Sequence, residues 1–473
     1  MSEPAHSNRA LAVLLLVVFI NLVGFGVIIP LLPFYARSMD AAPWQVTTMF
    51  AAYSLGQFFG EPFWGRLSDR IGRRPVLIVT IIANTLAYLA LAFAPNIWVA
   101  MLIRLVGGFG SGNISTIQGY MADVTPPEKR AGRMGLLGAA FGAGFVIGPG
   151  LVMVMRPGSG PLGYQLPLFL AAGMAATAAL GVILFVKESR APSAPGAPQA
   201  HRLEALSQAA SHPILSRVLL VTLISTAAFA GMEAVFGLYA DTRFGWTASQ
   251  VAACFALIGV IASIGQGVLT GRLARRFGEA RVLTAGLSII ATSLLITPFI
   301  SRPALAVVAV ACTAFGQSLV FPCVGALISR ATPPDRQGQM LGLNMAAGSL
   351  ARIGGPLLAG PLFGLAIGGP YWFGAALMVP AIGFAPILED GAKAPTRNAE
   401  VEDQVGRQEA LQTDRHGQAE GRRRRQAPPP DRPQWQVHPP KPRNQGDERG
   451  RRQDHPHVPA LRPVRGALTH GSR

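Results

Sequence analysis

The sequence contains little charge. Asp, Glu, Lys and Arg make up 14% of its 473 residues, whereas an ordinary soluble domain carries about 25%. Half of the residues are hydrophobic, and the mean hydropathy is +0.36. This composition is typical of a membrane protein.

Cysteine and the common catalytic motifs are also scarce. The three cysteines, Cys254, Cys312 and Cys323, lie in apolar segments, where cysteine usually serves as a small buried hydrophobe, and no disulfide framework or metal-site spacing is present. The sequence lacks a phosphate-binding G-x-x-x-x-G-K-[ST] and a zinc-binding H-E-x-x-H. We therefore expect no enzyme, no metal or cofactor, and no direct use of ATP by this chain.

Long apolar segments are what the sequence has in abundance. About 20 apolar residues in a helix cross roughly 30 Å of hydrocarbon with every backbone group satisfied. Pro380 and Pro386 interrupt the last such segment. The pattern predicts an all-α integral membrane protein with twelve spans, near residues 10–33, 45–64, 75–95, 97–119, 132–155, 164–186, 214–240, 248–270, 281–300, 303–326, 339–362 and 370–388.

The basic residues fall on alternate connections between these spans. One set of connections holds seventeen Lys and Arg, and the other set holds only Arg37, Arg156, Arg243 and Arg302. Positively charged loops stay in the cytoplasm, so both termini are predicted to be cytoplasmic and the protein to reside in the cell membrane. This topology also accounts for most of the net charge of +17, so we expect no nucleic-acid partner.

Composition divides the chain into four parts. Residues 188–213 are rich in Pro, Ala and Ser and separate six predicted spans (1–187) from six more (214–388). Residues 389–473 are rich in Arg, Pro and Gln and are predicted to be disordered. This tail could bind lipid or a partner, have no function, or be an out-of-frame translation of a GC-rich gene.

Two motifs recur in the second half. GRLSDRIGRRPVL (65–77) shares seven of thirteen residues with GRLARRFGEARVL (271–283), and TPPEKRAGRMGLLGAAFGAGFVIGP (125–149) aligns with TPPDRQGQMLGLNMAAGSLARIGGP (332–356). The offsets are 206 and 207 residues. We infer an internal duplication, in which parallel repeats enclose a central path.

The loop at 65–74 combines glycine with opposite charges. Gly65 and Gly72 permit tight backbone geometry at either end. Asp69 and Arg73 are four residues apart and can reach each other, and Asp69 could lie at a helix N-terminus, where an anion is favoured. Such a cluster could latch one conformation and release another.

This loop resembles the signature G-x-L-[SA]-D-R-x-G-R-[RK] of the major facilitator superfamily, including Arg70. The resemblance covers residues 10–388 and implies two six-helix halves. It also implies a charge relay of Asp69, Arg73 and Asp123 that governs closure. Simple positive-inside anchoring would explain the arginines, but not Asp69 or the glycines.

Two further elements are similar to motifs of this superfamily. Arg104 begins R-x-x-x-G-x-x-x-G in the fourth span, an element linked there to proton transfer, although a snorkelling arginine is the alternative. Gly144, Gly148 and Pro149 match part of the antiporter signature, but Val152 and Met153 replace two expected glycines. The partial match favours export over import.

The first span gives a more specific resemblance. NLVGFGVIIPLLP (21–33) is similar to the D-x-x-G-x-G-x-x-x-P-x-L-P of tetracycline-resistance-type exporters, with Asn21 in the place of the acidic residue. An amide cannot titrate or balance a cationic metal–drug chelate. This difference argues against tetracycline itself as the substrate.

Few acidic residues lie within the spans. Glu233, in the middle of the seventh span, is predicted to carry a proton, because a carboxylate in a low-dielectric site can cycle between neutral and charged forms. Permanent neutralisation by Arg352 of the eleventh span is the alternative. Glu61 is expected at the membrane interface, and Gln57 is one of several amides that could line the path or join helices.

The predicted function is proton-coupled efflux of drugs or related amphipathic molecules by a monomer that alternates access between the two sides of the membrane. The expected partners are this small-molecule substrate, protons as the coupling ion, and membrane lipid. Uptake of a metabolite such as a sugar or organic acid is the alternative within this fold. A membrane receptor or scaffold that transports nothing is the alternative outside it.

Overall fold

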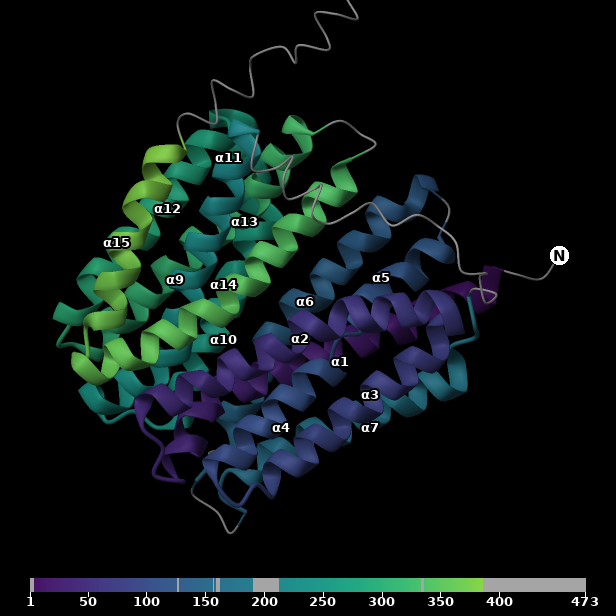
Figure 1. The fold of residues 1–473 in the computed structure, drawn as a ribbon, viewed down its shortest axis with the longest axis horizontal. Coiled ribbons are helices and arrows are strands. Elements are labelled where there is room, and N and C mark those ends of the chain that lie inside the picture. Colours follow the sequence, from purple (N-terminus) through teal and green to yellow (C-terminus); the bar gives the residue numbers. More distant parts are fainter. Residues whose placement is uncertain are drawn as a thin grey trace, which may run out of the picture. The chain divides into compact units, whose positions relative to one another are not determined.

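The computed structural model describes residues 4–125, 127–155, 157–158, 162–189, 212–332 and 336–385, and the described chain is helical apart from its turns. The predicted tail at 389–473 lies outside these residues. So does the predicted linker at 188–213, apart from its first two and last two residues. Figure 1 shows the helices in sequence colours.

The described helices before the linker are α1 (Pro4–Arg37), α2 (Pro43–Ile71), α3 (Arg73–Ala92), α4 (Ile97–Gly110), α5 (Ile114–Asp123), α6 (Pro127–Met155) and α7 (Gln165–Phe185). Those after it are α9 (Pro213–Phe244), α10 (Ala248–Ile264), the π-helical η1 (Gly265–Leu269), α11 (Thr270–Phe277), α12 (Glu279–Ile296), the short 3₁₀ helix η2 (Thr297–Phe299), α13 (Pro303–Ala331), α14 (Gln337–Leu365) and α15 (Gly369–Phe384).

Each of the twelve predicted spans falls on one helix or on abutting helices. Eight helical stretches of the described chain are long and apolar enough by themselves to cross a membrane. The predicted spans outside this set correspond to α2, α6, α14 and α15. In α2 and α14, polar residues such as Gln57 and Arg352 interrupt the apolar run. Pro380 lies inside α15, and the helix ends before Pro386.

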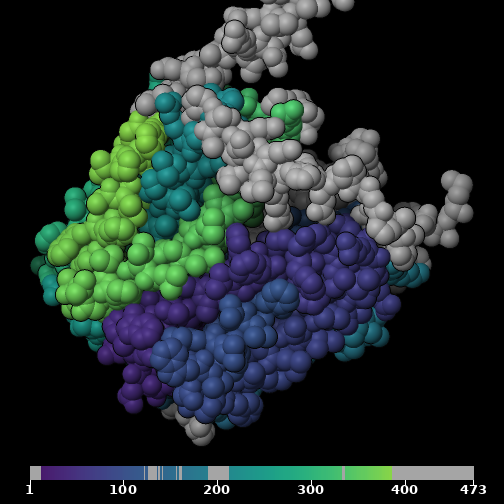
Figure 2. Space-filling model, viewed as in Figure 1, coloured from purple at the N-terminus to yellow at the C-terminus, as the bar shows by residue number. Residues whose placement is uncertain are grey.

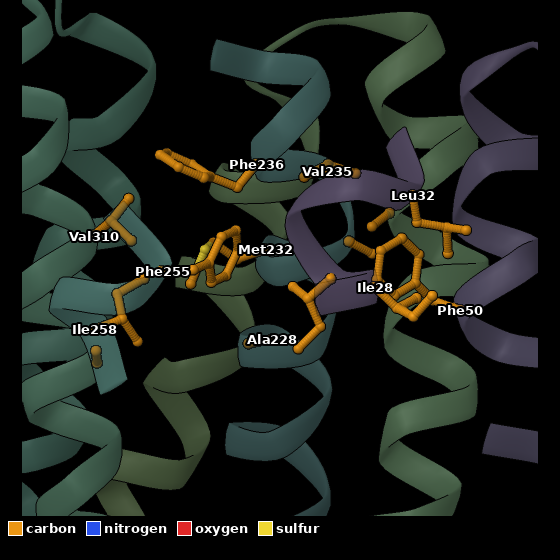
Figure 3. Close-up of a cluster of buried hydrophobic side chains, with 14 of the residues drawn as sticks. Ile28, Leu32, Phe50, Ala228, Met232, Val235, Phe236, Phe255, Ile258 and Val310 are labelled. Carbon is orange, nitrogen blue, oxygen red and sulfur yellow. The ribbon is translucent and has the colours of Figure 1, made fainter. Parts of the chain in front are cut away.

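Helices from the two sides of the linker pack against each other. α2 lies along α14 (Figures 1 and 2), and α6 packs against α10. α1 and α9 also meet, and Figure 3 shows the buried core at this contact, where Ile28, Leu32 and Phe50 lie near Ala228 and Met232. The assignment of 1–187 and 214–388 as separate halves stays a prediction.

The helical bundle has two ends, and an ion pair joins two helices at one of them. We call the end at which α2 meets α3 the Asp69 end, and the end at which α1 meets α2 the Arg37 end. Arg37, in the last turn of α1, forms an ion pair with Asp241, in the last turn of α9. This pair joins residues 204 positions apart and ties α1 to α9 at the Arg37 end.

Candidate functional site

The charged cluster at the Asp69 end is built around Arg73. This residue is the first of α3, and its guanidinium contacts Asp69 of α2 at 2.7 Å and Asp123 of α5 at 3.3 Å. Nη1 of Arg73 also donates a hydrogen bond to Ser68 Oγ at 2.6 Å. The Arg73 side chain is only 9% exposed. The structure thus brings the three residues of the predicted relay together, while Arg70 is exposed.

Close packing against α5 holds this arginine in place. A Cβ atom on Gly119 of α5 would lie 2.6 Å from Cζ of Arg73. The guanidinium therefore rests directly on the backbone of α5, where a larger residue would displace it. The sequence alone offers no sign of this role for Gly119.

The turn between α2 and α3 differs from the expected loop. Helix α2 continues through Gly65 as far as Ile71, so Gly65 is helical and packs near Ser115 Oγ. Only Gly72 has the conformation that glycine favours, with φ of 105° and ψ of 158°. The expectation of tight geometry at both glycines is therefore correct for Gly72 and wrong for Gly65.

A carboxylate that we did not predict for this cluster caps α3. Glu188 follows α7, and its two oxygens accept hydrogen bonds from the backbone N–H groups of Arg73 at 2.8 Å and Arg74 at 3.1 Å. These are orphan donors of the first helical turn, where an anion is also favoured by the helix dipole. The helix N-terminal place considered for Asp69 thus belongs to Glu188.

The duplicated loop repeats the turn but not the cluster. Gly278, between α11 and α12, has φ of 86° and ψ of 150°, close to the values of Gly72. The next residue, Glu279, pairs with Arg330 of α13 at 2.5 Å, and the Arg330 side chain is 59% exposed. The second loop therefore has an ion pair whose arginine is exposed and whose carboxylate is 16% exposed, where the first has a buried arginine.

Arg104 lies inside the bundle. It is 5% exposed, its Cζ lies 4.2 Å from the ring centroid of Tyr53, and its Nε donates to the carbonyl oxygen of Met49 at 3.5 Å. A cation over an aromatic face gains electrostatic stabilisation. This placement excludes the alternative of a side chain that snorkels to the membrane surface.

Asn21 belongs to a chain of buried amides. Its Nδ2 donates to Asn113 Oδ1 at 3.3 Å, and its Oδ1 accepts from Asn84 Nδ2 at 3.4 Å. The chain joins α1 to α3 and to the break between α4 and α5. The position that resembles an acidic site in other exporters is therefore an uncharged hydrogen-bonding site here.

The glycines of the antiporter-like motif bring α6 close to α1. A Cβ atom on Gly144 would lie 2.5 Å from Leu22 Cβ, and one on Gly148 would lie 2.6 Å from the carbonyl oxygen of Val23. Pro149 contacts Gly26 in the same way, at 2.9 Å from a Cβ there. These residues form a helix contact that larger side chains would force apart.

The acidic residues within the spans lie on two helices that pack against the helix of Arg352. Glu233 of α9 and Glu61 of α2 are half-buried, and so is Arg352 on α14, a helix that packs against both α9 and α2. Gln57 is half-buried one turn before Glu61. The expectation that Glu61 lies at the membrane interface stays a prediction.

The described residues contain no group of three or more His, Cys, Asp or Glu placed to hold a metal ion. The site instead consists of intramembrane charges and a charged turn. Residues 14–356 match the Major Facilitator Superfamily, and a second match covers residues 267–418. The chain belongs to the Major Facilitator Superfamily.

The curated relatives of this superfamily member cover most of its length. Tetracycline resistance protein, class C, from Escherichia coli is 30% identical, over 82% of this chain and 98% of the relative. Multidrug resistance protein 2 from Bacillus subtilis (strain 168) is 27% identical, over 82% of this chain and 98% of the relative. Membership makes the chain a multi-pass membrane protein and a secondary transporter, not an enzyme.

Solved structures share its fold. The human organic anion transporter MFSD10 (TETRAN) superimposes with a TM-score of 0.61 at 24% identity, over 80% of this chain and 99% of that one. A bacterial homologue of the human lysosomal transporter Spinster, in an inward-facing and unoccupied conformation, has a TM-score of 0.63 at 16% identity, over 82% and 96% of the two chains. The chain therefore shares the fold of these two proteins.

Proposed function

We propose that this transporter exports drugs or related amphipathic small molecules in exchange for protons. The observation that carries the proposal is Glu233, a half-buried carboxylate in the middle of α9, which packs against α14, the helix that carries Arg352. An ionisable residue within a span is costly unless it is paired or serves transport. The names of the relatives, tetracycline and multidrug resistance proteins, support drugs as the substrate class.

In this proposal, protonation of Glu233 drives the return of the empty transporter. The Arg37 end faces the outside, in line with the distribution of basic residues. A proton that enters from there neutralises Glu233 and weakens its attraction to Arg352. The change favours the conformation that opens to the cytoplasm, where drug binds and the proton leaves.

The cluster of Asp69, Arg73 and Asp123 then acts as the cytoplasmic gate. Its ion pairs hold the end of α2, the start of α3 and the end of α5 together. We propose that this unit moves as one body during closure. The proton could also act here by loosening these pairs, since protonation of an aspartate removes its charge.

The amides around Asn21 indicate which charge on a substrate this site can accommodate. Because Asn21 hydrogen bonds to Asn84 and Asn113, the site can offer hydrogen bonds but no negative charge. A chelate of tetracycline with a divalent metal is cationic and would gain nothing from it. We therefore propose that other amphipathic drugs are better substrates than metal–tetracycline.

The test uses inverted membrane vesicles in which respiration acidifies the interior and quenches acridine orange fluorescence. Addition of a transported drug should release protons and restore fluorescence, and Glu233→Gln should abolish this response at equal protein levels. Asp40→Asn is the matched control, because Asp40 is exposed at the Arg37 end and its φ of 57° also suits asparagine.

If none of the drugs tested restores fluorescence in wild-type vesicles, this result would contradict export in exchange for protons. Accumulation of a metabolite in whole cells, dependent on this protein, would then support the alternative of uptake. A response that Glu233→Gln leaves unchanged would retain export but remove Glu233 from its proposed role.

A further inference from the structure

The chain of buried amides ends in a donor that has no partner. Asn84 Nδ2 donates to Asn21 Oδ1 at 3.4 Å, and Asn21 Nδ2 donates to Asn113 Oδ1 at 3.3 Å. Asn113 is 1% exposed, and its own Nδ2 atom is buried without a hydrogen bond to any described residue. Proteins rarely bury a donor in this way, because an unmade hydrogen bond is costly. The chain of amides therefore lacks one acceptor.

The direction of these hydrogen bonds makes Asn113 a stronger donor. Each amide donates to the oxygen of the next one, and hydrogen bonds in such a chain polarise one another. Asn113 is the last member and lies in the break between α4 and α5. Its NH2 group is uncharged and can only donate. The missing acceptor is therefore an oxygen that needs no negative charge, such as a neutral carbonyl.

Two residues of α1 mark where a small molecule can reach this donor. Residues 20–36 of α1 are buried except for Asn21 and Phe25, which are half-buried. These two residues are four apart and lie on the same face of the helix. Because α1 packs against α2, α5, α6, α7, α9 and α10, this face lies among helices. The accessible part of α1 thus presents an amide and an aromatic ring one turn apart.

Phe25 belongs to an aromatic cluster that extends to the other side of the linker. Its ring centroid lies 5.9 Å from that of Tyr53 on α2 and 5.8 Å from that of Phe145 on α6. Phe145 is half-buried, and its carbonyl oxygen would lie 2.6 Å from a Cβ on Gly259 of α10. Aromatic rings at such separations attract one another and can accept a further flat ring. The amide donor therefore lies one helical turn from a surface that suits an aromatic molecule.

We propose that Asn113 Nδ2 donates a hydrogen bond to an uncharged oxygen of the exported molecule, while Phe25 and Phe145 contact its aromatic ring. The molecule thereby supplies the acceptor that the chain of amides lacks. This inference rests on the proposed function and narrows its substrate class to neutral aromatic molecules that carry a carbonyl or a similar oxygen.

Binding to the purified protein separates the hydrogen bond from the apolar contacts. Xanthone and xanthene have the same fused rings, and xanthene carries a methylene group where xanthone has its carbonyl. Each is used to displace a labelled drug that the vesicle assay shows to be exported. We expect wild type to bind xanthone at least about threefold more tightly. The infrared carbonyl band of bound xanthone should lie at lower frequency than in an apolar solvent, because a hydrogen bond weakens the C=O bond.

Asn113→Leu removes the donor and keeps the branched shape of the side chain. We expect this variant to lose both the preference for xanthone and the infrared shift. Asn344→Leu is the matched control, because Asn344 is also buried and also accepts one side-chain hydrogen bond, from Thr222 Oγ1 at 2.6 Å. This control should keep the preference. Phe25→Leu should weaken the binding of xanthone and xanthene alike, since both present the same rings to Phe25.

Equal binding of xanthone and xanthene by wild type, or no displacement by xanthone, would overturn the proposal while leaving drug export intact. So would a preference that Asn113→Leu retains or that Asn344→Leu loses equally. If Asn113→Leu does not fold, the wild-type comparison and its infrared band still decide. The absence of any exported drug in the vesicle assay would remove the proposed function itself.

Discussion

The two copies of the charged loop differ in what surrounds the same turn. In both copies a glycine with positive φ separates two helices, Gly72 in the first and Gly278 in the second. In the first copy Arg73 is buried between Asp69 and Asp123, whereas in the second Arg330 is largely exposed beside Glu279. The duplicated backbone has thus kept the turn, but the paired arginine is buried at the first copy and exposed at the second.

This difference predicts that the two loops contribute unequally to transport. An exposed ion pair contributes little, because water and salt screen it. A buried cation with two carboxylate partners is costly to disturb, because removal of one member leaves the others unpaired. We therefore expect the first loop to dominate gating and the second to serve mainly as a hinge between helices.

The largest expected difference between the two loops follows from replacing the arginine of each ion pair. Arg73→Gln should reduce drug transport by at least about tenfold, which corresponds to a loss of about 1.4 kcal/mol in the closed state, because it leaves Asp69 and Asp123 facing each other without a cation. Arg330→Gln should reduce transport by less than about twofold. Initial rates in vesicles, normalised to protein in the membrane, compare the two. Equal losses would show that burial does not set the functional weight of the loops.

The glycines at the two turns give the next largest effect. Gly72→Ala and Gly278→Ala both force alanine into a backbone region open almost only to glycine, at a cost of about 1–3 kcal/mol. Gly72→Ala should cost more, since its new Cβ would lie 2.7 Å from Cδ of Glu188 and displace this cap. Thermal unfolding in detergent measures the difference. A variant with Gly72→Ala that is as stable as wild type would show that the turn is not strained.

Loss of the cap itself should have a smaller effect. Glu188→Ala leaves the N–H groups of Arg73 and Arg74 without their carboxylate, and we expect the free energy of unfolding to fall by about 1 kcal/mol. Ser189→Ala, at the neighbouring residue, tests whether its hydrogen bond to Asp123 at 3.3 Å matters as much. Comparable melting temperatures for these two variants would argue against the capping role of Glu188.

The smallest effect is expected for the exposed pair of the second loop. Glu279→Gln should change stability by about 0.5 kcal/mol or less, and by less still in high salt, because the partner Arg330 is 59% exposed. Melting temperatures at low and high salt measure this. A destabilisation of several kcal/mol that salt does not reduce would make the two loops equivalent after all.

Much of the charged turn could be predicted from the sequence. Arg73 contacts Asp69, as their spacing of four residues predicts, and Asp123, as the resemblance to the superfamily implies. The cap from Glu188 could not be predicted, since 115 residues separate it from Arg73. Its position depends on how α7 packs against α3. The sequence KES at 187–189 contains an acidic residue at a span end, but gives no direction for its side chain.

The intramembrane polar residues also show that sequence predicts which residues are unusual but not which residues they contact. The sequence indicated that Glu233 and Arg352 are unusual, because charge within an apolar run is visible from composition alone. It placed Glu61 at the interface, since Glu61 is only four residues from the charged loop. The packing of α2 on α14, the helix that carries Arg352, could not be read from the sequence. In the same way, the meeting of Asn21 with Asn84 and Asn113 depends on three helices from different parts of the chain.

The sequence by itself determined the membrane class, the positions of the helices and the repeated glycine turns. Hydropathy over about 20 residues and the backbone freedom of glycine are local properties that a single segment expresses. Only the tertiary structure decided which charges are buried, which amides bind Asn21 and which acid caps α3. These outcomes depend on the register between packed helices, and a shift of one helical turn moves a side chain by about 5 Å and breaks its contact.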